Sequence, residues 1–240
     1  GIPAAALRDF VRKVGVARAN SLVDLALFEH TVREHLNRAA ERRMAVLRPL
    51  KLVIENYPEG PGETLTAINH PDNPEAGTRG VTFSREIYVE AEDFMEDPPR
   101  KFFRLSPGRE VRLRYAYLVT CKEVVKNAAG EVVELRCTYD PASRGGNAPD
   151  GRKVQATLHW VNAADAVPAD IRLINTLFDK PEPGANGDVM ADLNPDSMVT
   201  LRGCLLEPDL ARFGAGTTVQ FERQGYFCAD PDSQPGALVF

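Results

Sequence analysis

Long apolar runs are missing from this sequence of 240 residues. No stretch approaches the roughly 18 apolar residues that a membrane-spanning helix requires. The first residues also lack the uninterrupted apolar core of a secretory signal peptide. We therefore expect a protein without a membrane anchor that works in the cytoplasm.

The sequence is also poor in patterns of metal ligands. Its four cysteines form no C-x-x-C pair, and none has a histidine at the spacing of a zinc site. His30 and His35 are five residues apart, so they would not be neighbours on one helix face as residues i and i+4 are. We predict no metal site and no cofactor in this chain.

Sequence signatures of catalysis are absent as well. There is no G-x-x-x-x-G-K-[ST] phosphate loop, no G-x-G-x-x-G dinucleotide motif and no G-x-S-x-G nucleophile elbow. The acid-rich segment 90–97 (EAEDFMED) does not have the spacing of a calcium loop, and solvated carboxylates explain it more simply. We predict no catalytic residue.

Acidic residues outnumber basic ones by 34 to 29, so the formal net charge is -5. A chain of this charge repels polyanions at long range, and nucleic-acid binding would need a local basic surface. Basic residues do cluster, in three groups: Arg38, Arg42, Arg43 and Arg48, then Arg100, Lys101 and Arg104, then Arg109, Arg112 and Arg114.

Turn-forming residues are plentiful, with 18 glycines and 18 prolines. This composition favours short strands joined by turns. Helical periodicity is confined to the first forty residues or so, with one helix between Pro3 and Gly15 and a second after Ser21, its predicted N-cap. Beyond them, short strands without long helices between them indicate a mainly β fold, a barrel or a sandwich. These strands include a hairpin with its turn at residues 127–130, where Gly130 can supply a positive φ, and one strand over residues 218–228.

The clearest strand is predicted over residues 110–120, where apolar and polar side chains alternate. In one regular strand Arg112 and Arg114 project from the same face. Such arginines beside aromatic rings suit single-stranded RNA, because bases stack on planar groups and the guanidinium fork can meet a base edge or a phosphate. The alternative, which composition alone favours, is that both coat a solvated face and pair with Glu110 or another surface acid.

Five runs of the sequence resemble one known family. They are RRMAVLRPLKLVIENYPEG, INHPDNPEAGTRGVTFSREIYVEAEDF, GREVRLRYAYLVTC, DGRKVQATLHWVNAADAVPADIRLINTLF and FERQGYFCAD. In this order they are similar to the C-terminal half of bacterial-type glutaminyl-tRNA synthetase, a class I aminoacyl-tRNA synthetase. The resemblance implies a small α-helical subdomain at residues 1–43. It also implies an anticodon-binding region of two interleaved antiparallel β-barrels at residues 44–240, with the distal barrel at roughly residues 105–200.

The same resemblance implies a function. The family joins glutamine to its tRNA using ATP and Mg²⁺, so the expected partner is a tRNA with a glutamine anticodon, and a monomer is expected. The HIGH-type and KMSKS-type signatures of the family's nucleotide-binding region are not in this chain, and we expect it to be inactive alone. Two alternatives stay open: the same region of an archaeal or eukaryotic-type glutamyl-tRNA synthetase, and a free-standing RNA-binding barrel module.

Four residues match family positions that read individual bases. The resemblance implies a pocket for the middle anticodon uridine at Arg42, Gln220 and Arg223, and a third-base contact at Arg104. Gln220 and Arg223 would lie on opposite faces of one regular strand. We therefore predict a bulge or a strand end between them.

Three more residues match the family near the anticodon. Arg112 and Arg114 correspond to a further basic pair, and Asn37 corresponds to a polar contact on the helix before the barrels. Two positions depart from the family pattern. Asp72 stands where a neutral asparagine is common, and Phe103 stands where a lysine often precedes the third-base arginine.

Overall fold

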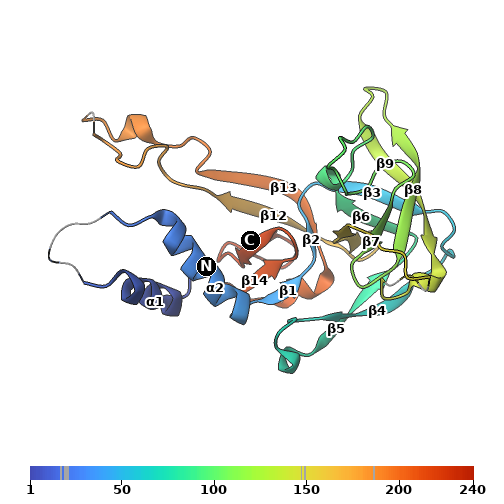
Figure 1. The fold of residues 1–240 in the computed structure, drawn as a ribbon, viewed down its shortest axis with the longest axis horizontal. Helices are drawn as coiled ribbons and strands as arrows, with labels where there is room; N and C mark the ends of the chain where they lie inside the picture. Colours follow the sequence, from blue (N-terminus) through green and yellow to red (C-terminus); the bar gives the residue numbers. More distant parts are fainter. Residues whose placement is uncertain (17, 19–21, 147, 149, 186) are drawn as a thin grey trace.

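The computed structural model describes residues 1–16, 18, 22–146, 148, 150–185 and 187–240. In this part of the chain the protein is mainly β, as predicted, with two α-helices at its N-terminal end (Figure 1). The helices are α1 (Ala4–Val14) and α2 (Leu25–Ala39). No helix in the described ranges is both long enough and apolar enough to cross a membrane.

Helix α1 begins and ends where the sequence predicts. It starts directly after Pro3 and stops at Gly15, whose φ of 75° is in the left-handed region that favours glycine. The ring of Phe10 meets the ring of Phe28 edge-on, with centroids 5.1 Å apart. This contact packs α1 against α2.

Helix α2 begins later than the sequence predicts. Its N-cap is Asp24, whose carboxylate accepts a hydrogen bond from the backbone N–H of Ala26 at 2.9 Å. The predicted cap, Ser21, is therefore wrong, and this residue lies outside the described ranges. An aspartate is as good an N-cap as a serine, and the sequence offers both within four residues.

Short strands make up most of the molecule. They are β1 (Glu41–Arg43), β2 (Ala45–Val46), β3 (Pro49–Ile54), β4 (Glu63–Ile68), β5 (Thr78–Phe83), β6 (Glu86–Glu90), β7 (Glu110–Leu113), β8 (Leu118–Lys126), β9 (Val132–Asp140), β10 (Thr157–Leu158), β11 (Val161–Asn162), β12 (Val167–Ile174), β13 (Met198–Leu206), β14 (Thr218–Phe221), β15 (Gly225–Cys228) and β16 (Leu238–Val239).

The strands form four sheets, with the orders β10-β7-β8-β9-β3-β6-β11, β16-β12-β13-β2, β1-β14-β15 and β4-β5. The largest sheet curls at the end of the molecule away from the helices, and the hairpin β12–β13 extends back alongside them (Figure 1). Four pairs are parallel: β1 with β14, β3 with β9, β7 with β10 and β12 with β16. The predicted antiparallel pairing is wrong at these places, because long connections bring distant strands together.

Two hydrophobic cores lie among the described residues. One is built from residues between Met44 and Val161, and it includes the fully buried Phe83 and Trp160. The other joins Ala45 and Leu47 to apolar residues from 169–240. The chain thus passes from one core to the other between β1 and β3.

The predicted strand over residues 110–120 is wrong at its centre. β7 ends at Leu113, β8 begins at Leu118, and the two pair as an antiparallel hairpin. Tyr115, in the turn, has a φ of 63°, which is uncommon for any residue except glycine, asparagine or aspartate. The turn has no such residue, and apolar alternation runs straight through it, so the sequence gives no sign of the break.

Of two other turns, one follows its prediction, and the other divides a segment that was wrongly predicted as one strand. The hairpin predicted around residues 127–130 is confirmed as the turn between β8 and β9, with Gly130 at a φ of 83°. Residues 218–228, predicted as one strand, form the hairpin β14–β15 with Arg223 in its turn. A strand end therefore separates Gln220 from Arg223, as predicted.

Candidate nucleic-acid interface

One group of predicted residues lies where α2 meets the three-stranded sheet β1-β14-β15 (Figure 1). Arg42 on β1 is in register with Gln220 on β14, and Gln220 is in register with Tyr226 on β15. Side chains in such a row point to one face of a sheet. Asn37 of α2 contacts this row, and we call these four residues the Asn37 group.

Asn37 is the shared acceptor of its group. Its Oδ1 accepts hydrogen bonds from Nη2 of Arg42 at 2.8 Å and from the hydroxyl of Tyr226 at 3.3 Å. Its backbone carbonyl accepts from Nη2 of Arg42 at 2.8 Å and from Nε2 of His70 at 3.0 Å. Because Oδ1 faces these donors, the amide NH₂ of this exposed residue is left to face solvent.

His70 supports Asn37 from behind. Its Nδ1 accepts a hydrogen bond from the backbone N–H of Asp72 at 3.1 Å, which leaves Nε2 as the donor to Asn37. The His70 residue is 6% exposed. His70 thus acts on the candidate interface through Asn37, and Asp72 contributes a backbone group to this arrangement.

Arg42 is 5% exposed, which is little for an arginine in a binding site. Besides the bonds to Asn37, its Nη1 donates to the carbonyl of Ala40. Hydrogen bonds to Ala40 and Asn37 therefore occupy three of the five guanidinium N–H groups. The side chain is fixed by the protein itself, so any RNA would meet it already in place.

A second group forms around Asp93, the last residue of the short 3₁₀ helix η2 (Ala91–Asp93). Nη1 of Arg223 lies 2.5 Å from Oδ2 of Asp93, and Nη2 lies 2.7 Å from Oδ1. Nε of Arg104 lies 3.4 Å from the same Oδ1. The two arginines and Asp93, together with His159 beside Arg223, are called the Asp93 group below.

Arg223 forms hydrogen bonds with residues other than Arg42 and Gln220, with which the resemblance groups it. The hydrogen bonds that the structure shows for Arg223 go to Asp93 and His159, whereas Arg42 and Gln220 belong to the Asn37 group. The cause is local: β14 ends at Phe221, and a φ of 68° at Arg223 turns the backbone. Arg223 is therefore brought together with Arg104.

Arg114 lies in the β7–β8 turn and forms an ion pair with Glu222, which directly precedes Arg223. The guanidinium carbon of Arg114 is 5.0 Å from the ring centroid of Tyr115, and the Tyr115 hydroxyl donates to Glu222 at 2.8 Å. Burial, with the nearby charge of Glu222, raises the pKa of Tyr115 to about 12. Arg114 thus pairs with an acid, but Glu222 is buried, so the alternative of pairing with a surface acid is wrong for Arg114.

Arg112 is separate from both groups. It lies on β7, and its side chain packs on Gly146, where a Cβ would come within 2.8 Å of Cδ of Arg112. The shared strand face predicted for Arg112 and Arg114 is wrong, because β7 ends between them. Glu110, the other acid considered, pairs with Arg152.

Sequence reasoning missed the acceptors that organise these arginines. Asp93 belongs to the acid-rich segment 90–97, whose carboxylates are predicted to be solvated, yet its side chain is 3% exposed. Glu222 is 5% exposed, and no sequence pattern marks it as buried, although it stands in the run FERQGYFCAD. Tyr226 stands in the run FERQGYFCAD, and its role depends on a cross-strand register that only the fold reveals.

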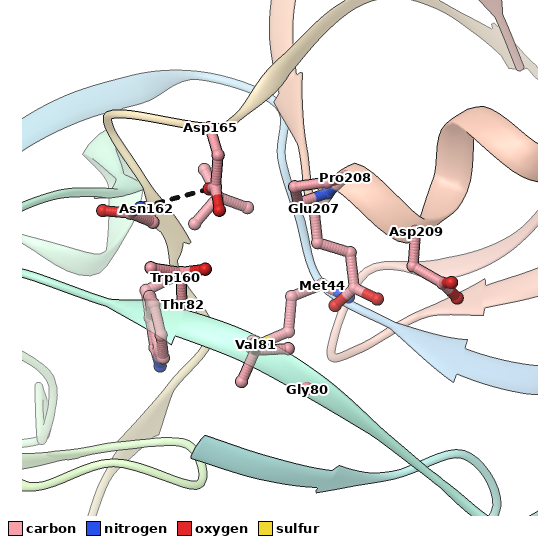
Figure 2. A pocket seen from close by; sticks show the side chains of 11 residues that line it. Met44, Gly80, Val81, Thr82, Trp160, Asn162, Asp165, Glu207, Pro208 and Asp209 are labelled. Atoms are coloured by element: carbon pink, nitrogen blue, oxygen red, sulfur yellow. Dashed lines mark hydrogen bonds between the residues drawn. The ribbon is translucent and has the colours of Figure 1, made fainter. Parts of the chain in front are cut away.

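A small cavity of about 160 Å³ lies apart from both groups. Figure 2 shows Met44 and Trp160 at its wall, with the carboxylates of Asp165, Glu207 and Asp209 around it. No predicted site residue lines it, and three carboxylates disfavour a polyanion. In the described ranges no cluster of three or more histidine, cysteine, aspartate or glutamate side chains is arranged to hold a metal ion.

Comparison with known families gives two matches. Both have the description "tRNA synthetases class I (E and Q), anti-codon binding domain", and they cover residues 40–140 and 157–230. They include the residues of both groups except Asn37.

Curated relatives match the chain from end to end. Glutamine–tRNA ligases of Nitrobacter winogradskyi and Bradyrhizobium diazoefficiens are 67% and 62% identical over 240 residues, and that of Clostridium kluyveri is 49% identical over 243. Each match covers 100% of this chain and 43% or 44% of the relative. The chain therefore spans less than half the length of these relatives, in their C-terminal part. On these matches, the chain belongs to the anticodon-binding domains of class I tRNA synthetases (E and Q), and over its whole length it is similar to the C-terminal part of glutamine–tRNA ligases.

Proposed function

We propose that this chain is the anticodon-recognition part of a glutamine–tRNA ligase, which attaches glutamine to its tRNA using ATP and Mg²⁺. The observation that carries the proposal is the Asn37 group, a row of polar side chains on one sheet face that falls mostly within the two matched anticodon-binding domains. Its donors and acceptors are fixed by the protein, which suits the reading of base edges.

The two groups supply complementary chemistry in this proposal. The Asn37 group offers amide and hydroxyl groups beside the buried guanidinium group of Arg42. The Asp93 group offers two partly exposed guanidinium groups, with Arg104 48% and Arg223 30% exposed. Planar guanidinium groups can stack on splayed bases or bind phosphates, so these arginines would attract RNA to a chain that is acidic overall.

We also propose the two-barrel organisation that the family resemblance implies. Residues 1–43 would form the helical subdomain, and residues 44–240 the two interleaved barrels. The two separate hydrophobic cores support two packing units. The distal barrel at roughly residues 105–200 remains a prediction.

We assign the aminoacylation reaction to parts of the enzyme outside this chain. The chain lacks the HIGH-type and KMSKS-type signatures, so ATP and Mg²⁺ would bind outside it, and by itself it would form no aminoacyl-adenylate. A monomer in the cytoplasm is part of the same proposal.

The direct test is tRNA binding at two salt concentrations. The cognate tRNA with a glutamine anticodon is compared with the same tRNA whose middle uridine is replaced. A preference for the cognate loop supports the proposal. Equal affinity of the full-length gene product for both tRNAs contradicts it.

Glutamate is a second candidate amino acid, because the description of the matched family models includes both E and Q. Charging of purified full-length protein with glutamine and with glutamate, each with its own tRNA, separates the two. Charging with neither amino acid would favour the remaining alternative, an RNA-binding barrel module without ligase activity.

A further inference from the structure

We propose that Asp93 is a positioning residue for base discrimination. Its carboxylate holds the guanidinium groups of Arg104 and Arg223 in one fixed arrangement before tRNA binds. The inference rests on the proposed function, since it assigns these arginines to the anticodon. It goes beyond that function by naming the group on which their placement depends.

The geometry makes Asp93 a shared anchor. Arg223 binds both carboxylate oxygens, at 2.5 and 2.7 Å, in the bidentate form that fixes the plane of a guanidinium group. Arg104 approaches Oδ1 at 3.4 Å, and its Nη1 also donates to the carbonyl of Glu92 at 3.2 Å. These arginines come from opposite halves of the chain, so Asp93 sets their mutual placement.

Burial strengthens this anchor. The Asp93 side chain is 3% exposed, whereas the two arginines it holds are 48% and 30% exposed. Water therefore competes little for the carboxylate, while the outer parts of both guanidinium groups stay accessible. Two cations share one anion, so Asp93 leaves one of the positive charges uncompensated.

Arg223 is also held from its other side. Its Nη1 lies 3.1 Å from Nδ1 of His159, which must accept, so Nε2 of this ring carries the proton. That nitrogen lies 3.4 Å from Oε1 of Glu90, which also accepts from the side-chain amide of Gln224 at 2.7 Å. His159 and Glu90 are 1% and 4% exposed. The turn that carries Arg223 is thereby fastened to the core beneath it.

The alternative hypothesis is that Asp93 is a mask, that is, its carboxylate competes with RNA for the arginines and weakens tRNA binding. The two hypotheses predict different effects of removing the carboxylate. Removing the carboxylate would improve tRNA binding if Asp93 is a mask, because a negative charge near RNA disappears. It would reduce base discrimination if Asp93 positions the arginines.

The experiment compares Asp93→Asn with Glu92→Gln in the full-length gene product. Both substitutions remove one negative charge from η2, but the Glu92 side chain is 65% exposed and, among the described residues, pairs only with the exposed Arg48. The affinity for cognate tRNA is divided by the affinity for tRNAs substituted at the middle or at the third anticodon base. These ratios do not depend on the fraction of folded protein.

We expect Asp93→Asn to lower both ratios by about tenfold, which corresponds to roughly 1.4 kcal/mol. Glu92→Gln is expected to keep both ratios and to raise the affinity for all tRNAs slightly. Unchanged ratios in Asp93→Asn, or tighter binding with intact discrimination, would overturn the proposal. If the wild type itself does not discriminate, the proposed function fails instead.

A second variant keeps the test decisive if Asp93→Asn does not fold. Asp93→Glu retains the charge and displaces the carboxylate by one methylene. The proposal then predicts lower ratios with an unchanged dependence of affinity on salt. Wild-type ratios in this variant would contradict a role that depends on position.

Discussion

The Arg104 side chain can be removed without breaking the contact between Arg223 and Asp93. Arg104→Ala removes one partner of Asp93, while the bidentate contact of Arg223 remains. We expect it to reduce discrimination at the third anticodon base by about 1–3 kcal/mol, the range of a good base-edge contact, and to leave the middle base unaffected. Affinities for cognate and base-substituted tRNAs measure this directly.

Arg100→Ala is the matched control for that substitution. Arg100 is an exposed residue of the same basic cluster and carries the same charge. It should weaken the binding of all tRNAs alike and reduce the dependence of affinity on salt. Equal losses for cognate and substituted tRNA in Arg104→Ala would contradict a base-reading role.

Tyr115 makes one part of this region sensitive to alkaline pH. Its pKa is about 12 in the folded protein, against an ordinary value near 10, because the phenol is buried beside Glu222. The stability linked to this raised pKa is complete below pH 10 and is lost as the pH rises toward 12. We expect Tyr115→Phe to show a smaller loss of the free energy of unfolding over this interval.

Denaturant unfolding of both proteins at several alkaline pH values measures that difference. Tyr117 also has a pKa of about 12, so the wild type retains other sources of alkaline loss. The contribution of Tyr115 is therefore the difference between wild type and variant in the loss of the free energy of unfolding. Parallel losses in the two proteins would exclude its contribution.

At the level of single residues, the sequence predicts the arginines but not their acceptors. Family resemblance places Arg42 and Arg223 within quoted runs and Arg104 between two of them. Whether an acid such as Asp93 is solvated or buried depends on packing between distant segments. No pattern in the local sequence carries that information.

Among the elements, a turn could be predicted from the sequence where a glycine occupies its positive-φ position, and could not where another residue does. The β8–β9 hairpin is predicted because Gly130 supplies a positive φ between two apolar runs. The β7–β8 and β14–β15 turns place Tyr115 and Arg223 in the same region of φ, against the usual preference. Tertiary contacts to Glu222 and Asp93 accompany both exceptions. They also occur at the candidate interface, where backbone strain is tolerated more often.

Gly130→Ala tests the hairpin turn as an element. The alanine would have to occupy a φ of 83°, and we expect a loss of roughly 1–2 kcal/mol in the free energy of unfolding. Gly214→Ala is the control, because Gly214 has open space around it and lies outside the positive-φ region. That variant should be neutral or slightly stabilised, and urea unfolding compares the two. Similar effects of both substitutions would contradict the role assigned to the turn.

For the whole molecule, a buried ionic network joins segments that are far apart in sequence. Arg79 on β5 binds both carboxylate oxygens of Glu207, at 2.6 and 2.8 Å, and Nε of Arg43 on β1 lies 3.3 Å from one of them. The backbone N–H of Met44 donates to Glu207 at 3.0 Å. Met44 belongs to the first core, and its neighbour Ala45 belongs to the second. Glu207 therefore fastens the chain where it crosses between the cores.

Glu207→Gln tests whether this network stabilises the molecule as a whole. The Glu207 side chain is 4% exposed and that of Arg43 is fully buried, so the loss of the carboxylate leaves buried guanidinium groups with less compensation. Removing one partner of a buried ion pair costs about 3–5 kcal/mol, and we expect a loss of that size in the free energy of unfolding.

Glu59→Gln is the control for charge alone. The Glu59 side chain is 87% exposed and lies 3.5 Å from its partner Arg85, so its loss should cost no more than about 1 kcal/mol. Denaturant unfolding followed by a probe in each core decides between two outcomes. If Glu207 couples the cores, both probes shift together to lower denaturant in Glu207→Gln. A shift of the probe in one core alone would show that Glu207 stabilises only that core, because the loss of an interaction that couples both cores would destabilise both.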